Sequence, residues 1–344
     1  MESSGQASVG AVPAHARLIQ MGIGYWVSRL VYVAARLGLA DYLADGPKSA
    51  AELAEATQTH APSLHRVMRA LAGLGVLSED DNHRFALTPL GEALKTGAPG
   101  SARSTILALA GEWWWRGWEQ FDYSLATGST GMQKVFGMSV FEYLASHPQD
   151  ASYFNEAMIG FHGDEPPAVA SIFDFSRFGT VVDVGGGTGN LMAAILDRHS
   201  GVRGTLCELP HVVKAARTAL EARGLGDRVA VASIDFFKEV PPGGDAYILS
   251  HVLHDWTEAE CLTILGNCRT AMKADARLLI VETVLPAGNA PHPGKLLDIA
   301  MLVMPGGQER TEAEYGALVS KAGFRLVRVV PTPSAVSIFE AIPV

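Results

Sequence analysis

The sequence predicts an α/β protein in which a doubly wound, mostly parallel sheet follows a mostly helical N-terminal region. From Thr180 onward, short apolar runs alternate with helical patterns, which is the order of βαβ units. The first apolar run leads directly into a glycine-rich turn over 185–189, and ligands of such sheets bind at turns of this kind. The segment 16–94 has helical periodicity broken by turns, which predicts a separate N-terminal domain.

Composition limits the classes of function. The 344 residues allow about two domains, and a hydrophobic content of 48% is sufficient for their cores. A formal net charge of −9 argues against a partner bound through nucleic-acid phosphates or anionic lipid headgroups. No uninterrupted apolar run approaches the roughly 20 residues of a membrane span, and no signal peptide pattern opens the chain. We expect a cytoplasmic protein without a nucleic-acid or membrane partner.

The three cysteines, Cys207, Cys261 and Cys268, are odd in number and contain no C-x-x-C pair. That pattern favours reduced thiols that fill the core over a disulfide framework or a zinc site.

The N-terminal domain has the order of a winged helix. Residues 1–14 are rich in Ser, Gly, Ala and Pro without periodicity, and we expect an unstructured tail there. The domain itself is expected over 15–105, with helices and then strands at 27–37, 49–56, 61–74, 75–77 and 85–87.

DNA binding is the usual function of such a domain, and 63–74 would be its recognition helix. Between residues 16 and 95, however, eight basic residues are balanced by eight acidic ones, so attraction to phosphates would be weak. The apolar segment 23–33 is too hydrophobic for a surface helix and indicates an interface or a buried monomer helix.

The stretch from Val181 to Asn190 predicts a cofactor site at Asp183, Gly185, Gly186 and Gly187. Glycines allow a tight strand-to-helix turn and a close approach of the cofactor to the backbone. The dinucleotide fingerprint needs a further glycine at the sixth position, where this chain has Asn190. No Lys-Ser/Thr pair for phosphates follows either, so we expect an adenosine-bearing cofactor other than NAD or a nucleoside triphosphate.

Acidic residues follow the next two predicted strands. Glu208 ends the strand 202–207, where a carboxylate can accept hydrogen bonds from both ribose hydroxyls. Asp235 and Phe236 follow the strand 229–232, where they can accept from an adenine amino group and cover its ring. Carboxylates at strand ends are often merely solvated, but three in register favour a site.

His254 follows the predicted strand 246–249 at the same edge of the sheet. A lone histidine is more often structural than catalytic. Two carboxylates change that balance, because Glu282 ends the strand 278–281 and Glu309 precedes the helix 311–322. Either could hold one imidazole nitrogen, fix the tautomer and stabilise the imidazolium.

Three segments together resemble a known family. They are the glycine run 183–189, Leu-His-Asp-Trp at 253–256 and Gly-Gly-Gln-Glu-Arg-Thr at 306–311. The chain is similar, over nearly its whole length, to metal-independent O-methyltransferases that use S-adenosylmethionine (SAM) and release S-adenosylhomocysteine. Plant caffeate enzymes and bacterial polyketide-tailoring enzymes typify this family.

The resemblance implies an architecture. It implies a winged-helix homodimerisation domain over 15–105 and a helical connector over 106–175 that lines the acceptor pocket. A Rossmann-like class I methyltransferase domain over 176–344 would bind SAM, with its last strand antiparallel near 334–341.

The resemblance also implies which residues form the site. His254 would be the general base and Glu282 and Glu309 its orienters. Phe154, Met158 and Phe161 share a helical face that usually means core, and the family uses the matching helix to hold a flat aromatic acceptor. Further candidates for the pocket are Trp115, Asp298 and Met301, of which Asp298 is expected on the pocket floor.

The acceptor chemistry follows from proton affinities. A phenol and an unperturbed imidazole differ by about 3.5 pKa units, a gap that carboxylate neighbours reduce by raising the pKa of the histidine. An aliphatic alcohol would be a poorer acceptor, so we expect a phenolic aromatic compound. Its identity, its pathway and any part played by the partner subunit in the pocket are left open by one sequence.

Departures from the plant members concern the cofactor. Ser250 stands where those enzymes carry a lysine, which removes a cation near the adenine side, and Glu208 stands where many have aspartate. The second change is chemically mild.

Three alternatives stay open at this level. A metal-dependent branch of O-methyltransferases needs clustered carboxylates, and His251 with His254 offers no apparent third ligand in the sequence, so we expect no metal and no sensitivity to EDTA. Some members of this fold bind SAM without methylating and act as hydroxylases or decarboxylases. A SAM-sensing winged-helix regulator is disfavoured by the balanced charge of the N-terminal domain.

Overall fold

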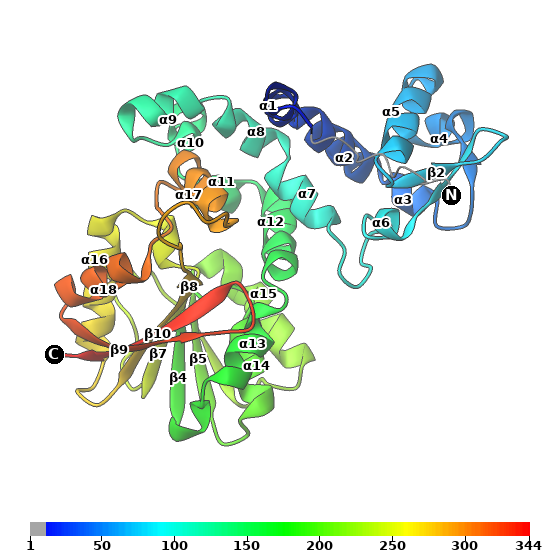
Figure 1. Ribbon diagram of the computed structural model, residues 1–344. Helices are drawn as coiled ribbons and strands as arrows, with labels where there is room; N and C mark the ends of the chain where they lie inside the picture. Colours follow the sequence, from blue (N-terminus) through cyan, green and yellow to red (C-terminus); the bar gives the residue numbers. More distant parts are fainter. Residues whose placement is uncertain (1–11) are drawn as a thin grey trace, which may run out of the picture. The chain divides into compact units, whose positions relative to one another are not determined.

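The computed structural model describes residues 12–344, and the chain divides after Gly111 into two compact units (Figure 1). Most of the connector predicted at 106–175 falls in the second unit, which begins at Glu112. Of the tail predicted at 1–14, residues 1–11 lie outside the described residues, and a helix already begins at Ala14.

The first unit has the predicted order of a winged helix. Its helices are α1 (Ala14–Gly22), α2 (Tyr25–Leu37), α3 (Leu39–Tyr42), α4 (Ala50–Thr57), α5 (Ala61–Gly73), α6 (Pro89–Glu92) and α7 (Arg103–Leu109). Its strands β1 (Lys48–Ser49), β2 (Leu77–Glu79) and β3 (Arg84–Leu87) form an antiparallel sheet in the order β1-β3-β2. Helix α4 begins at a capping box in which Ser49 and Glu52 satisfy each other's backbone N–H groups.

The helices α1 and α2 expose apolar side chains to an unusual extent. Leu18, Ile19, Met21 and Trp26 are each more than half exposed. By length and composition alone, Ala14–Leu37 is one segment apolar enough to cross a membrane, although only 11% of its window is buried. The sequence prediction considered uninterrupted apolar runs only and therefore missed it, because polar residues interrupt the pattern.

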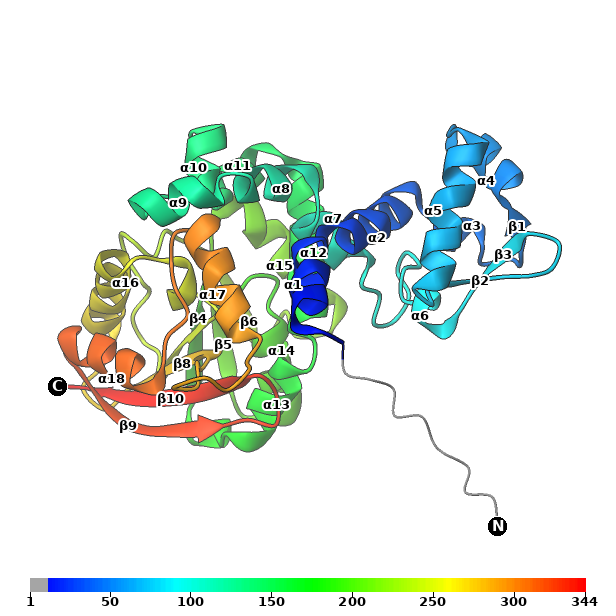
Figure 2. The same ribbon diagram turned by 45° about the horizontal axis from the view of Figure 1, so that its top comes forward.

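The second unit is built on a seven-stranded sheet in the order β6-β5-β4-β7-β8-β10-β9. The strands are β4 (Thr180–Val184), β5 (Arg203–Glu208), β6 (Val229–Ser233), β7 (Ala246–Ser250), β8 (Arg277–Thr283), β9 (Phe324–Pro331) and β10 (Val336–Pro343). Strands β4 to β8 pair in parallel, and β10 pairs antiparallel with both β8 and β9. Figure 2 shows β9 and β10 together at one edge, so the predicted antiparallel last strand is confirmed.

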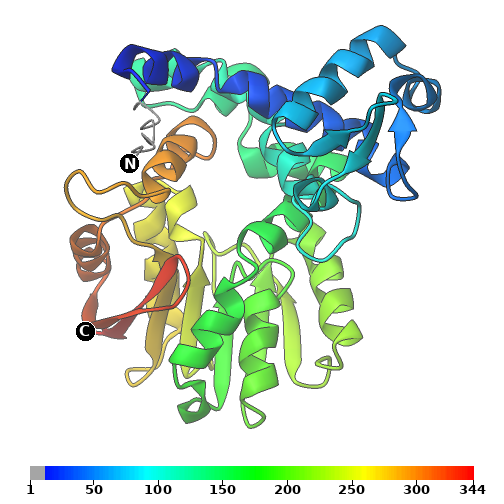
Figure 3. The same ribbon diagram turned by 45° about the vertical axis from the view of Figure 1, so that its right-hand side comes forward.

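Helices cover both faces of this sheet, as a doubly wound fold requires. One core packs one sheet face against α13 (Glu165–Ile172), α14 (Asn190–Arg198) and α15 (Pro210–Ala222). Figure 3 shows α13 and α14 side by side in green on this face. The other core packs the opposite face against α16 (Glu258–Ala271) and α18 (Glu312–Lys321), and it contains the three cysteines as buried free thiols.

A helical layer stands above the carboxyl ends of the strands. It comprises α8 (Glu112–Trp118), α9 (Phe121–Thr127), α10 (Gly131–Phe136), α11 (Val140–Ser146), α12 (Pro148–Phe161) and α17 (Gly294–Val303). Its own core joins Trp113, Met132, Tyr143 and Met304. Two short 3-10 helices, Phe175–Arg177 and Leu253–Asp255, complete the unit, and the second carries His254.

Candidate active site

The glycine turn after β4 can be made only by residues without side chains. Gly185, Gly187 and Gly189 have φ of 75°, 57° and 85°, in the left-handed region that favours glycine. A Cβ atom on Gly186 would lie 2.5 Å from Oδ2 of Asp183 and in collision with Leu206. The turn therefore packs tightly against Asp183 and Leu206 at Gly186, while a Cβ atom on Gly187 would meet nothing within 4 Å, so the space beside Gly187 is open.

Asp183 lies under this turn with an unsatisfied carboxylate. The residue is fully buried, and neither carboxylate oxygen has a hydrogen-bond partner within the described part of the chain. Burial raises the pKa of Asp183 to about 7, and the nearby Glu208 carboxylate adds to the shift. Because an unpaired buried carboxylate costs stability, this position is suited to a ligand that supplies hydrogen-bond donors.

The other cofactor candidates lie along the same strand ends. Glu208 accepts hydrogen bonds from the backbone N–H groups of Gly187 at 2.9 Å and Leu209 at 2.7 Å, which orients its carboxylate beside the turn. Asp235 accepts from the N–H of Phe237 at 3.0 Å, with Nζ of Lys238 3.1 Å from its other oxygen.

Phe236 and Ser250 complete this group. A Cβ atom on Gly185 would lie 3.4 Å from the Phe236 ring, so the ring borders the turn. Ser250 is the last residue of β7. An orphaned carboxylate, a turn without side chains, a second carboxylate and an aromatic ring fit SAM, whose ammonium, ribose and adenine groups need acceptors and an apolar face.

His254 lies between two carboxylates, Glu282 at the end of β8 and Glu309 in the loop before α18. It is buried, and its Nδ1 lies 2.7 Å from Oε1 of Glu309. Oε1 of Glu282 accepts the backbone N–H groups of Val252 at 3.1 Å and Leu253 at 2.9 Å. The predicted contact of His254 with a carboxylate is present: Glu309 contacts the ring directly, while Glu282 holds the backbone before it and places Oε2 3.7 Å from Nδ1.

The carboxylates around His254 determine the direction in which its pKa is shifted. Burial alone lowers the pKa of His254, but the carboxylates of Glu282, Asp255 and Glu309 outweigh it and raise that pKa to about 10. Burial also raises the pKa of Glu282 to about 8. With Nδ1 bound to Glu309, Nε2 is the nitrogen that can take a proton from a ligand; Oδ1 of Asp255 lies 3.7 Å from it.

Two residues that support His254 were not identified from the sequence. The buried Arg310 donates from Nη1 to the carbonyl of Leu253 at 2.9 Å and from Nη2 to that of Trp256 at 3.3 Å. A Cβ atom on Gly307 would collide with the backbone carbonyl of His254. Both belong to the motif 306–311, so the signal was in the sequence, but their contacts depend on the path of the loop.

The acceptor candidates do not all share one environment. On α12, Phe154 packs against Trp113 in the core of the helical layer, Met158 lines a cavity, and Phe161 is 52% exposed. Trp115 on α8 donates from Nε1 to Glu119 at 3.0 Å. These four residues remain predictions as pocket residues.

Of the two candidates on α17, Asp298 contacts the backbone of Glu309. Oδ1 of Asp298 accepts the backbone N–H of Glu309 at 2.9 Å, and Met301 is buried on the same helix. Asp298 thus fixes the residue that holds His254, and its place in the pocket stays a prediction.

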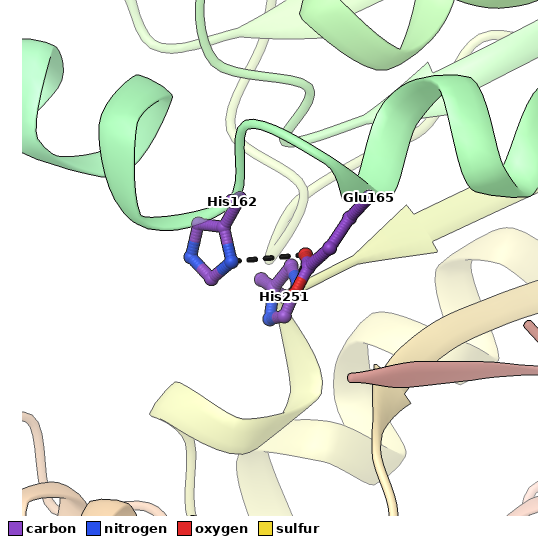
Figure 4. A group of neighbouring side chains, drawn as sticks. All are labelled: His162, Glu165 and His251. Carbon is purple, nitrogen blue, oxygen red and sulfur yellow. Dashed lines mark hydrogen bonds and ion pairs between the residues drawn. The ribbon is translucent and has the colours of Figure 1, made fainter. Parts of the chain in front are cut away.

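A second histidine cluster lies beside His254 and was missed. Oε2 of Glu165, at the start of α13, lies 2.9 Å from Nδ1 of His162 and 2.6 Å from Nε2 of His251 (Figure 4). Glu165 is thus a third metal-ligating side chain near His251, which corrects the expectation that none is present; Glu282 and His254 form another such group with it. Glu165 and His251 are 86 residues apart in the sequence, so no local pattern could indicate that they are in contact.

Glu165 and His251 have shifted pKa values that give them different charges at neutral pH. Burial favours the neutral form of Glu165, but its bonds to His162 and His251 outweigh burial and lower its pKa to about 2. Burial lowers the pKa of His251 to about 4, although the bond to Glu165 opposes the shift. Glu165 is therefore a carboxylate and His251 a neutral imidazole at neutral pH.

Comparison with known proteins identifies the family. Residues 118–325 match the O-methyltransferase domain, and residues 19–97 match the O-methyltransferase dimerisation domain. A phenazine O-methyltransferase of Lysobacter antibioticus is 47% identical over 97% of this chain and 98% of its own length. The mitomycin biosynthesis 6-O-methyltransferase of Streptomyces lavendulae is 40% identical over 90% of this chain and 88% of its own. A phenazine-1-carboxylate N-methyltransferase of Pseudomonas aeruginosa is 35% identical over 92% and 93%.

Solved structures agree. The mitomycin 7-O-methyltransferase superposes with a TM-score of 0.92 at 38% identity, covering 96% of this chain and 98% of that one. An O-methyltransferase from neocarzinostatin biosynthesis, solved with SAM and 2-hydroxy-5-methyl naphthoic acid, superposes with a TM-score of 0.83 at 33% identity, covering 92% and 96%. The chain therefore belongs to the O-methyltransferase family and is a methyltransferase whose cofactor is S-adenosylmethionine.

Proposed function

We propose that this methyltransferase acts on a phenolic hydroxyl of an aromatic small molecule, without a metal ion, and that His254 is its general base. The observation that carries the proposal is the 2.7 Å contact between Nδ1 of the buried His254 and Oε1 of Glu309. A histidine held in this way has one tautomer and one free nitrogen, which is the arrangement a directional base needs.

The direction of the pKa shift of His254 suits a phenol. The surrounding carboxylates raise this pKa from 6.5 toward the pKa of a phenol, which reduces the free-energy cost of moving the proton from the acceptor to Nε2. An aliphatic alcohol, with a far higher pKa, would not be deprotonated to a useful extent. The same shift leaves His254 largely protonated at neutral pH, so activity should increase as the pH rises.

The cofactor supplies the rest of the chemistry. When bound, SAM offers a methyl group on a sulfonium, which leaves as an uncharged thioether. The chain's own part is to hold and align: Asp183 and Glu208 would bind the cofactor's donors, Phe236 would cover its adenine, and His254 would take the proton. The catalytic contribution of such alignment is large in reactions between two bound molecules.

The acceptor is expected to be a flat aromatic compound. Relatives are named for phenazine, mitomycin and naphthoate compounds, and Trp115, Phe154, Met158, Phe161 and Met301 would provide an apolar slot. N-methylation is the second candidate, because a relative that is 35% identical is named as a phenazine-1-carboxylate N-methyltransferase. A ring nitrogen carries its own lone pair and does not need a base.

We infer further that the enzyme is a homodimer in the cytoplasm. The first unit matches the dimerisation domain, and Leu18, Ile19, Met21 and Trp26 on α1 and α2 are exposed in the single chain. Apolar surface of this kind is usually covered by a partner.

A panel of acceptors tests the proposal. Matched phenols, aliphatic alcohols and ring nitrogens are incubated with methyl-labelled SAM, with and without EDTA, and the products are identified by mass spectrometry. We expect labelled methyl ethers of the phenols in the presence of EDTA. Faster labelling of the alcohols, or labelling only of nitrogens, would overturn the phenolic assignment.

A further inference from the structure

We propose that His162, Glu165 and His251 bind a divalent transition-metal ion of the Zn²⁺ type. The site is distinct from the His254–Glu309 pair.

The three donors converge from separate elements. His162 follows α12, Glu165 opens α13 and His251 follows β7, yet their ligand atoms all lie within 4.8 Å of one another. Figure 4 shows both imidazoles turned toward the one carboxylate. Their side chains are 17%, 12% and 13% exposed, so the cluster is mostly shielded from bulk water. One ion can contact all three after small side-chain adjustments.

The donor set selects the class of ion. Two imidazole nitrogens with one carboxylate oxygen suit Zn²⁺ and related borderline ions, whereas Mg²⁺ and Ca²⁺ prefer sets made of oxygen. The Glu165 carboxylate supplies one negative charge facing the ion. Three protein ligands also leave a coordination position for water.

One of the three proposed ligands borders a cavity. The cavity has a volume of about 550 Å³ and is lined by His162 together with Met158, Gly163 and Pro166. An ion can therefore approach the cluster from the side of His162, and an entry path is one of the features that a metal site needs.

Two buried atoms next to the cluster, which have no hydrogen-bond partner, give an independent reason to propose a metal ion. Nδ1 of His251 and Oε2 of Glu282 are both buried without a hydrogen-bond partner among the described residues, and they lie 3.8 Å apart. With Nε2 of His251 donating to Glu165, the lone pair of Nδ1 faces the Glu282 oxygen. An ion bound at Nε2 moves the ring proton to Nδ1, where it can be donated to Glu282, which is the usual carboxylate–histidine–metal arrangement.

The backbone of His251 agrees with a functional position. Its φ of 51° is in the left-handed region, which a non-glycine residue adopts only at a cost in free energy. That conformation aims the ring between Glu165 and Glu282 rather than along the strand.

Cobalt absorption tests the site without reference to catalysis. The full-length protein is dialysed against EDTA, freed of EDTA and titrated with Co²⁺, and the visible d–d absorption is followed. We expect one Co²⁺ per chain, displaced by Zn²⁺, and affinity lower by about 10- to 100-fold or more in Glu165→Gln and in His162→Ala. His60→Ala, which changes an exposed histidine of the first unit, should bind as the wild type does.

Circular dichroism identifies any variant that fails to fold. If Glu165→Gln does not fold, the affinity of His162→Ala for Co²⁺ decides the test. Absence of Co²⁺ absorption in the wild type, or equal affinity in the wild type and the folded variants, would overturn the proposal. Because the readout does not involve methyl transfer, failure of the phenolic assignment would leave this result unaffected.

Discussion

The two halves of the sheet edge are prepared for their tasks in opposite ways. At β4 and β5, Asp183 is buried with both oxygens unpartnered among the described residues. At β7 and β8, the carboxylates of Glu282 and Glu309 are already engaged with the backbone before His254 and with its ring. In the first half, Asp183 has no partner on either oxygen, although Glu208 is held by the backbone; in the second half, Glu282 and Glu309 each have one oxygen bound within the protein and one, Oε2, without a partner among the described residues. Binding and catalysis should therefore respond separately to substitution.

The largest expected effect is on the catalytic half. Glu309→Gln keeps the shape but removes the charge that holds His254 and raises its pKa, and we expect methyl transfer to fall by about 10²-fold or more, up to the ~10⁴-fold known for such orienting carboxylates. The SAM dissociation constant should change little. Steady-state kinetics with Glu258→Gln, an exposed glutamate paired with Lys321, provide the matched control. If Glu309→Gln lowered SAM affinity and turnover by the same factor, the two halves would not have separate functions.

Gly186→Ala addresses the cofactor half. The added Cβ meets Oδ2 of Asp183 at 2.5 Å and collides with Leu206, so the turn must shift. We expect SAM affinity by calorimetry to fall about 10²-fold, which is within the cost of overpacking. Gly266→Ala, on α16 with open space around its Cβ position, is the control and should bind SAM normally. Unchanged affinity in Gly186→Ala would place the cofactor elsewhere.

Asp183→Asn should weaken binding and yet stabilise the free enzyme. The loss of a charged hydrogen-bond acceptor costs about 1.5–3 kcal/mol, or roughly 10- to 100-fold in SAM affinity. Without SAM, the variant should have a higher Tm because the unpaired buried charge is gone. Calorimetric titration and thermal melts measure the two effects, and a lower Tm in the free variant would contradict the contrast between the halves.

The sign of the pH dependence follows from the raised pKa. The folded pKa of Asp183, about 7, exceeds its ordinary 3.8, so its contribution to stability is present below pH 4 and is lost as the pH rises through about 7. In thermal melts without SAM, the Tm of the wild type should therefore fall as the pH rises over that window. The Tm of Asp183→Asn should fall less.

The last prediction concerns the pH dependence of activity, where the expected change is the smallest when it is counted per pH unit. Methyl transfer needs a neutral His254, so kcat/KM should rise about tenfold per pH unit below the pKa of that group, with the acid limb above the ordinary 6.5. The stabilisation that His254 gains from its carboxylates runs the other way: it is complete below 6.5 and is lost as the pH rises toward 10. A limb centred at or below 6.5 would mean that the carboxylates do not act on the base.

Much of this arrangement could be predicted from the sequence, and the reason is local. The glycine turn, Glu208, Asp235 and His254 each follow an apolar run, and parallel strands bring such positions to one edge. Glu309 could be predicted through its motif, although the distance to His254 could not. Asp298 was expected on a pocket floor, but its bond to the backbone of Glu309 depends on how α17 packs.

Other features depend on contacts between distant segments. The link between Glu165 and His251 requires that α13 pack beside the end of β7, and no periodicity in either segment encodes it. The carbonyls that Arg310 holds belong to a loop 57 residues earlier. Strand β9 was not predicted, because its apolar and polar residues alternate on an exposed edge next to a stronger strand signal.

The central claim is that His254 takes the proton of the acceptor. The most direct measurement compares the wild type with His254→Ala on a phenol that the wild type methylates, using labelled SAM, while SAM affinity is measured by calorimetry on the same preparations. The account predicts a loss of about 10²- to 10⁴-fold in labelled product with SAM affinity unchanged. A variant that binds SAM normally and methylates the phenol within a few-fold of the wild-type rate would show that His254 is not the base.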